Sequence, residues 1–277
     1  MESHVEDIAK ALKLDSIKLR QKNMMEVGFT DPFSKNVNYF DSLNQCIAKG
    51  REYIHWDEKL EKYKNQTGPI RRGIGMSIFW YNTAVWPISL ETSSCRMVLN
   101  QDGSIQLQIG ETEIGQGSDT AFAQMASETL GIKFEDVHVI STQDTDVTPF
   151  GTGSYASRQT YVAGFSIRQT AELLKEKILK HANELTRMPV YNLDIKDGNI
   201  VRTTDNKVLM TLGELSTEVL YSVTNCEHIT AESTYQCKSN AYSFGCCFAE
   251  IELDIPLCKI KVLDIVNVHD CGKLINP

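Results

Sequence analysis

The order of strand and helix patterns constrains the fold of this chain more than any other feature of its sequence. Two helix patterns in the middle of the chain are separated by one strand pattern and a long loop. The last third is rich in strand patterns, which are "GNIV", "HITAESTY", "SFGCCFAEIELD" and "KIKVLDIVNVHD". It also contains one short helix pattern, "TLGELST". Because strands and helices do not alternate regularly, the pattern favours an α+β fold over a doubly wound sheet. We therefore expect mixed sheets with packed helices in two-layer sandwich lobes.

The amino-terminal part differs in character from the rest. Residues 1–68 are polar and helical in pattern, with Asp15 or Ser16 and Asp41 or Ser42 as expected N-caps. From Gly73 strand patterns begin, and two of them flank the turn at residues 101–103, which is typical of a hairpin. The sequence thus predicts a helical N-terminal arm over residues 1–68 and an α+β region over residues 69–277. Sublobes are expected at about 69–190 and 191–277.

Composition excludes some classes of partner. The formal net charge is -8, and the Lys and Arg residues are dispersed, so nucleic acid is not an expected partner. The sequence starts without the apolar segment of a signal peptide, and no apolar run has the length of a membrane span. We therefore expect a cytoplasmic protein that does not bind a membrane.

Cysteine and histidine spacing does not predict a metal site made by side chains. The eight cysteines include no CxxC pair, and the six histidines are scattered. Reduced, mostly buried thiols and structural or surface histidines are the expectation.

Two glycine-containing loops precede the two central helix patterns. The first helix is expected over about 118–130, with Ser118 as N-cap and Gly131 as the stop, and the second over about 158–184. The apolar stripe of the second helix is Ala163, Ile167, Ala171, Leu174, Ile178 and Ala182. Gly164 beside that stripe indicates a close neighbour.

Helix starts offer unpaired N–H groups and partial positive charge, and glycine allows a ligand to approach the backbone. Gly115-Gln116-Gly117 and residues 151–157 could therefore hold one anionic ligand, with the Gln116 amide at the edge of a heterocycle. The alternative is that each loop is only a turn with a helix cap. Neither loop has the Lys of a phosphate-binding P-loop, and Thr120 replaces the third glycine of the dinucleotide fingerprint.

Acidic residues near these loops allow two interpretations. "DTDVT", residues 144–148, resembles the magnesium-binding nucleophile motif of haloacid dehalogenase-type phosphatases, with Asp144 and Asp146 as the paired carboxylates. The alternative is that these aspartates bond to neighbouring N–H groups and shape the loop. For Glu111 and Glu113 we favour solvated or loop-bracing roles.

Three motifs occur in order along the chain: "TEIGQGSDTAFAQMASETLGI", "DTDVTPFGTGSYASRQTYVAG" and "VLDIVNVHDCGKLINP". Together they resemble the molybdenum-binding part of the xanthine dehydrogenase and aldehyde oxidase family, in its bacterial form, and "RQKNMMEVG", "FDSLNQCIAKG" and "RRGIGMSIF" agree with the same family in the same order. The resemblance implies a molybdenum ion chelated by molybdopterin, with the cytosine dinucleotide form left open. It also implies that Ala156 lies beside the molybdenum without being a side-chain ligand. The cofactor-binding residues that it implies are Gly115, Gln116, Gly117, Ser154, Ala156, Ser157 and Arg158.

The family reaction is an oxidative hydroxylation of an N-heteroaromatic, such as a purine or nicotinate, or of an aldehyde, with water as the oxygen source. Iron-sulfur clusters and FAD are expected on partner chains or domains.

The catalytic glutamate of the family has no counterpart in this sequence, so no catalytic residue is assigned. We therefore expect a partial molybdenum hydroxylase, either a natural split subunit or a truncated product. Alone it should be inactive, because it needs the remaining segments or subunit of the molybdenum domain. A non-catalytic assembly module and a magnesium-dependent phosphatase using Asp144 and Asp146 are the alternatives.

Overall fold

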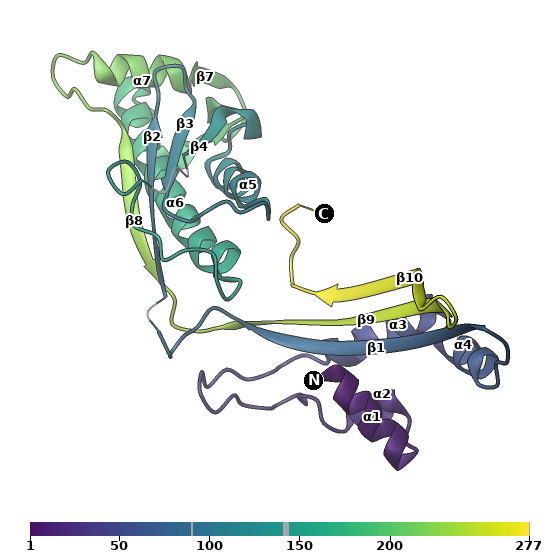
Figure 1. Cartoon of the computed structure of the whole chain (residues 1–277). Helices are drawn as coiled ribbons and strands as arrows, with labels where there is room; N and C mark the ends of the chain where they lie inside the picture. The colour runs from purple at the N-terminus through teal and green to yellow at the C-terminus, as the bar shows by residue number, and fades with distance from the viewer. Residues whose placement is uncertain (90, 141–143, 277) are drawn as a thin grey trace. The chain divides into compact units, whose positions relative to one another are not determined.

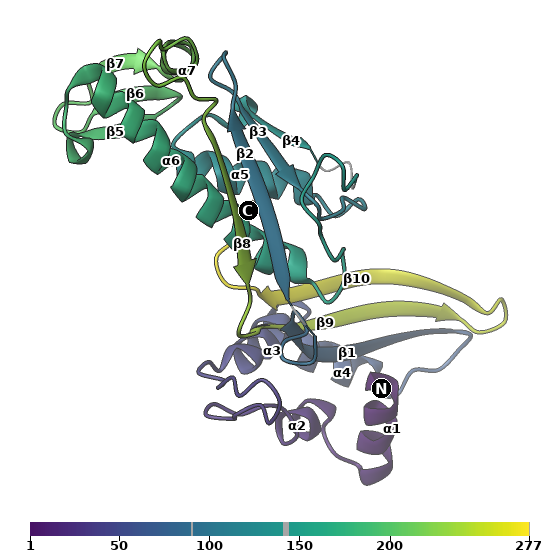
Figure 2. The same cartoon turned by 90° about the vertical axis from the view of Figure 1, so that its left-hand side faces the viewer.

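The chain forms two compact units in the computed structural model, which describes residues 1–89, 91–140 and 144–276 (Figures 1 and 2). Unit 1 combines Met1–Asn82 with Asn240–Leu274, so both ends of the chain contribute to it. Unit 2 consists of Thr83–Ser239 and the short segment that starts at Ile275.

Unit 1 is a three-stranded sheet covered by helices on one face. The strand order is β1-β9-β10, and β9 and β10 form a long antiparallel pair. The strands are β1 (Ile70–Thr83), β9 (Ala241–Asp254) and β10 (Lys259–Asp270). The helices are α1 (Glu2–Leu12), α2 (Ser16–Gln21), α3 (Ser42–Tyr53) and α4 (Trp56–Tyr63).

The helices of residues 1–68 share a core with these strands. A Cβ added to Gly50 of α3 would collide with the ring of Phe248, so α3 lies directly on β9. Trp56 packs edge-on against the same ring, at 5.4 Å between ring centroids. The compact units therefore divide the chain differently from the predicted arm. The apolar faces of α3 and β9 bury each other although they are far apart in the sequence, so local sequence patterns cannot predict that they pack together.

Unit 2 is built on a four-stranded mixed sheet of order β4-β3-β2-β8. β2 is antiparallel to β3 and β8, whereas β3 is parallel to β4 and is joined to it through α5. These elements are β2 (Thr92–Leu99), β3 (Ile105–Ile109), α5 (Ser118–Leu130), β4 (Val137–Ile140), α6 (Gly164–Thr186) and β8 (Thr230–Gln236). A smaller antiparallel sheet adds β5 (Leu193–Lys196), β6 (Asn199–Arg202) and β7 (Val208–Thr211), followed by α7 (Leu212–Leu220).

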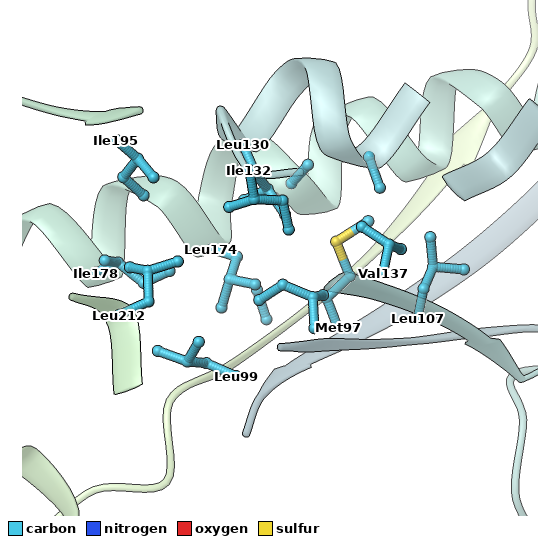
Figure 3. Close-up of a cluster of buried hydrophobic side chains, with 14 of the residues drawn as sticks. Met97, Leu99, Leu107, Leu130, Ile132, Val137, Leu174, Ile178, Ile195 and Leu212 are labelled. Atoms are coloured by element: carbon cyan, nitrogen blue, oxygen red, sulfur yellow. The ribbon is translucent and has the colours of Figure 1, made fainter. Parts of the chain in front are cut away.

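The core of unit 2 lies between α5, α6 and the sheets (Figure 3). The six apolar residues of the predicted stripe are all fully buried; five of them lie on α6, and Ala163 directly precedes it. Gly164 lies against Met125 of α5, whose sulfur would be 2.9 Å from an added Cβ, and this confirms the predicted close neighbour. Within the part of the chain described by the structure, no helix has both the length and the apolar character needed to cross a bilayer.

The α+β fold class, the hairpin and the bounds of α5 are confirmed. Two details were wrong. Gly117 is the N-cap of α5 and Ser118 is its first residue, and a π-helix, η2 (Gln159–Ala163), precedes α6. All eight thiols are free, but only half are buried: Cys46, Cys95, Cys237 and Cys246.

Gly131 ends α5 with φ 82° and lies directly against the carbonyl of Ile195. We expect Gly131→Ala to lower the free energy of unfolding by more than the roughly 1–2 kcal/mol of left-handed strain, because backbone must also move. Urea unfolding followed by circular dichroism measures the loss. The control is Gly115→Ala, which has similar strain (φ 97°) and open space around the added Cβ. Equal losses in both variants would contradict the contact with Ile195.

Candidate functional site

The first loop, residues 110–117, folds around the carboxylate of Glu113. This carboxylate accepts hydrogen bonds from the backbone N–H groups of Gly115 (2.7 Å), Gly117 (3.0 Å) and Asp119 (3.1 Å) and from the hydroxyl of Ser118 (3.0 Å). These bonds lower the pKa of Glu113 to about 2. Glu113 is therefore a loop brace, and it occupies part of the α5 start that the sequence predicted to receive an anion.

Gln116 lies exposed at the tip of the first loop. Its amide nitrogen donates to the carbonyl of Thr112 (3.1 Å), to the hydroxyl of Ser118 (2.9 Å) and to the side-chain oxygen of Gln159 (2.5 Å). Its amide oxygen accepts from the N–H of Ile114 (2.7 Å). The amide head is thus held in place from both ends.

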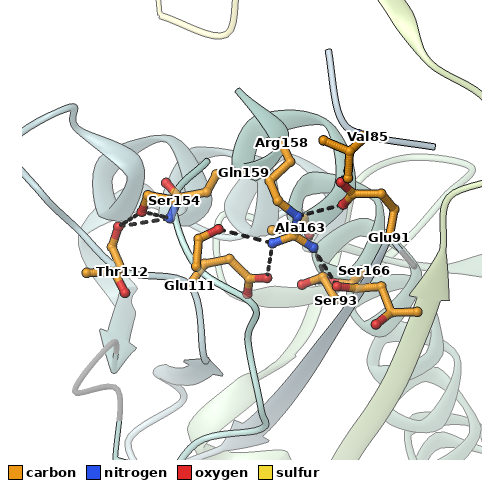
Figure 4. Close-up of polar contacts among 12 residues, drawn as sticks. Val85, Glu91, Ser93, Glu111, Thr112, Ser154, Arg158, Gln159, Ala163 and Ser166 are labelled. Carbon is orange, nitrogen blue, oxygen red and sulfur yellow. Dashed lines mark hydrogen bonds and ion pairs between the residues drawn. The ribbon is translucent and has the colours of Figure 1, made fainter. Parts of the chain in front are cut away.

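The second loop, residues 149–158, meets the first at the carbonyl oxygen of Thr112 (Figure 4). That oxygen accepts from the hydroxyl of Ser154 (2.7 Å) and from the amide of Gln159 (2.8 Å). The amide of Gln159 also donates to Ser154 (2.6 Å). The structure therefore brings the Gln116 loop and the Ser154 loop together, as the single-ligand hypothesis requires.

Two glycines make this approach possible: Gly151, which begins the predicted second loop, and Gly110, which the sequence analysis did not single out. A Cβ on Gly110 would collide with the backbone of Pro149 and Gly151, and a Cβ on Gly151 would lie 2.5 Å from the carbonyl of Gly110. The two loops therefore cross backbone to backbone. The only sequence signal for this contact was that both residues are glycines at the base of a loop.

Arg158 points into unit 2 and is fully buried, between two fully buried glutamates (Figure 4). Its guanidinium donates to Glu91 (Nε to Oε2, 2.7 Å) and to Glu111 (Nη1 to Oε1, 3.0 Å). Burial raises the pKa of Glu111, and the bonds with Arg158 oppose that rise. Glu111 is thus neither solvated nor at the loop surface. Glu91 was missed because nothing local marks it.

Ala156 and Ser157 directly precede Arg158 and both have left-handed backbone, with φ 47° and 51°. The carbonyl of Ala156 accepts from the N–H of Ala84 at 2.8 Å. The ring of Tyr155 lies over the Arg158 guanidinium, with 5.5 Å between the ring centroid and Cζ of Arg158. Two consecutive non-glycine residues in this conformation carry strain that the surrounding contacts must offset.

The exposed surface of the two loops fits the heterocycle of an organic ligand. Gly115, Gln116, Gly117 and Ser157 are exposed. A Cβ on Gly115, Gly117 or Gly153 would meet no atom within 4 Å, so backbone there is open to a ligand. Beside these glycines, Gln116 supplies both an amide donor and an amide acceptor.

Asp144 and Asp146 lie in a turn that their own chain braces. The Asp144 carboxylate accepts from the N–H of Asp146 at 3.0 Å, and its carbonyl accepts from the N–H groups of Val147 and Thr148. Thr142 and Gln143, which separate this motif from its strand, lie outside the described residues. Over residues 1–89, 91–140 and 144–276, no cluster of three or more His, Cys, Asp or Glu residues could hold a metal ion. The contacts agree with the loop-shaping interpretation of the two aspartates.

Residues 49–277 match the family model described as "Molybdopterin cofactor-binding domain". The chain belongs to this family. It is 41% identical over 278 residues to the "Xanthine dehydrogenase molybdenum-binding subunit" of Escherichia coli O157:H7, an alignment that covers 100% of this chain and 37% of that protein. The chain thus spans little more than a third of the length of this relative.

Solved structures share the fold. Quinoline 2-oxidoreductase from Pseudomonas putida 86 superposes with a TM-score of 0.81 at 22% identity, over 100% of this chain and 37% of that one. The Cu,Mo-CO dehydrogenase superposes with a TM-score of 0.79 at 24% identity, with the same coverage. At these identities the similarity establishes the fold alone.

The low pKa of Glu113 predicts a pH-dependent contribution to stability. Because the folded pKa (about 2) lies below the ordinary value of 4.5, the contribution is fully present above pH 4.5 and is lost as pH falls through 2. Glu113→Gln should therefore lower the urea midpoint at pH 7, and the difference from wild type should shrink between pH 4.5 and 2. Glu218→Gln, at an exposed position of α7, is the control. A difference that stays constant with pH would contradict this role.

Proposed function

We propose that unit 2 binds one side of a molybdopterin cofactor through the first and second loops. The observation that carries the proposal is the convergence of both loops on the Thr112 carbonyl, beside exposed glycine backbone and the Gln116 amide. Family membership supports the identity of the ligand. When bound, this cofactor supplies a redox-active Lewis-acid metal.

Each residue has a distinct role in this proposal. Gln116 binds the edge of the pterin by exchanging an internal hydrogen bond for one to the ligand. Gly115 and Gly117 let the pterin approach the backbone, and Ser154 and Ser157 lie near it. The methyl and backbone of Ala156 lie beside the metal. The Arg158 side chain contributes from beneath, since its guanidinium is buried.

We further propose the activity of the whole protein. It is the oxidative hydroxylation of an N-heteroaromatic, such as a purine or nicotinate, or of an aldehyde, with water as the oxygen source. The similarity to a xanthine dehydrogenase subunit favours a purine. The partners are the remaining molybdenum-domain segments and chains or domains with iron-sulfur clusters and FAD, all in the cytoplasm. Cytosine dinucleotide is one form that the cofactor can take.

Purification of the assembled enzyme that contains this chain tests the proposal. Molybdenum by mass spectrometry and pterin by fluorescence after oxidative release should both be present in amounts close to stoichiometric. A complex that contains this chain and all its partners but no pterin would instead identify a non-catalytic assembly module.

The Gln116 contact predicts a specific loss of cofactor. Gln116→Ala should reduce the pterin content of the assembled enzyme by about tenfold, because one good hydrogen bond to a buried ligand contributes about 1.4 kcal/mol. Circular dichroism should be unchanged. The matched control is Gln101→Ala, an exposed glutamine in the hairpin turn of the same unit. Equal pterin content in both variants would refute the contact.

The open backbone at Gly117 predicts a steric effect. Gly117→Ala places a methyl group where the ligand should approach, so pterin content should fall although no protein atom is displaced. Gly28→Ala is the control, because its φ of 90° imposes similar strain and its added methyl also meets open space. Comparable pterin loss in the two variants would show that strain alone is responsible.

A further inference from the structure

The Arg158 guanidinium makes four hydrogen bonds to three separate stretches of unit 2. Besides Glu91 and Glu111, it donates to the carbonyls of Thr92 (Nη2, 2.5 Å) and Gly153 (Nη1, 3.3 Å). Glu91 also accepts from the N–H of Val85 at 2.9 Å. Two of the four bonds go to carboxylates and two to backbone carbonyls.

These acceptors connect the ends of two strands with the second loop. Glu91 directly precedes β2, Thr92 is its first residue, and Glu111 lies two residues after the end of β3 and directly before Thr112. Gly153 belongs to the second loop, three residues before Ala156. One buried cation therefore connects both sides of the candidate site with the sheet beneath it.

The turn next to Arg158 needs such a connection. Ala156 and Ser157 keep left-handed backbone, which non-glycine residues leave readily unless contacts on both sides hold them. On one side the carbonyl of Ala156 is fixed by Ala84. On the other side the chain enters the interior at Arg158, and Tyr155 folds back over the guanidinium.

We propose that Arg158, held by Glu91 and Glu111, is a positioning residue that fixes the Ala156-Ser157 turn and the Thr112 carbonyl in their cofactor-binding geometry before the cofactor arrives. This inference rests on the proposed function of the two loops. It replaces a direct contact of the Arg158 side chain with the cofactor by an indirect role.

The role requires a guanidinium and not merely a positive charge. A planar guanidinium presents five N–H donors in a fixed arrangement, whereas the ammonium of lysine is a point charge with three donors on a flexible stem. Lysine could neutralise one carboxylate but could not span Glu91, Glu111 and the two carbonyls together. Arg158→Lys therefore separates charge compensation from positioning.

The experiment compares Arg158→Lys, Arg158→Met and wild type in the assembled enzyme. Three quantities are measured: the urea midpoint, hydrogen exchange of the backbone amides of residues 152–157, and pterin content. Arg158→Met leaves buried carboxylates without a cation and should lose stability strongly. We expect Arg158→Lys to recover most of the urea midpoint, while exchange in 152–157 rises at least tenfold and pterin content falls at least threefold.

The matched control is Arg168→Lys, which changes an exposed arginine that pairs with Glu172 on α6. It should leave all three quantities at their wild-type values. If Arg158→Lys does not fold, Glu91→Gln carries the test, because it removes one charge and one of two acceptor oxygens while Arg158 stays. The same changes in exchange and pterin content are then expected.

Other outcomes overturn the inference in distinguishable ways. If Arg158→Lys keeps wild-type exchange in residues 152–157, Arg158 does not position the turn. If exchange rises but pterin content stays constant while Gln116→Ala lowers it, the positioning role fails and the proposed function stands. If neither Arg158→Lys nor Gln116→Ala changes the pterin content, the proposed function fails and the inference fails with it.

Discussion

The candidate site depends on a buried ionic cluster in which one guanidinium is shared by two glutamates. Burial of three charged groups is costly, and loss of one partner from such a cluster commonly destabilises a protein by about 3–5 kcal/mol. Glu91, Glu111 and Arg158 are all fully buried, so each needs the others. The cluster joins the sheet, the first loop and the second loop.

Above this cluster the two loops are organised by short-range contacts. Gly110 and Gly151 let the two backbones cross, and the Thr112 carbonyl accepts donors from both loops. Glu113 braces the first loop from within. Because its carboxylate already lies at the start of α5, we infer that shape and hydrogen bonding contribute more to ligand binding than net positive charge. The sequence instead predicted that an anion binds at two helix starts with unpaired N–H groups.

Local features of the sequence predicted much of unit 2. The apolar stripe of α6, the end of α5 at Gly131 and the hairpin at residues 101–103 follow from periodicity and turn chemistry. The role of Arg158 did not follow, because its partners lie 47 and 67 residues away. The packing of α3 on β9 was not predicted for the same reason, since the two elements are far apart in the sequence. The residues of the candidate site remain predictions, since they came from a family resemblance, although the structure places their loops together.

Unit 1 is discontinuous in the sequence, whereas nearly all of unit 2 is one uninterrupted stretch. During synthesis the whole of unit 2 leaves the ribosome before β9 and β10 exist to pair with β1 and to receive the helices of residues 1–68. Unit 2 can therefore fold first, while the apolar surfaces of α3 and β1 remain exposed to solvent. Closure of unit 1 then depends on β9 and β10, which are made after unit 2, so the apolar faces of the helices of residues 1–68 stay uncovered while unit 2 is synthesised.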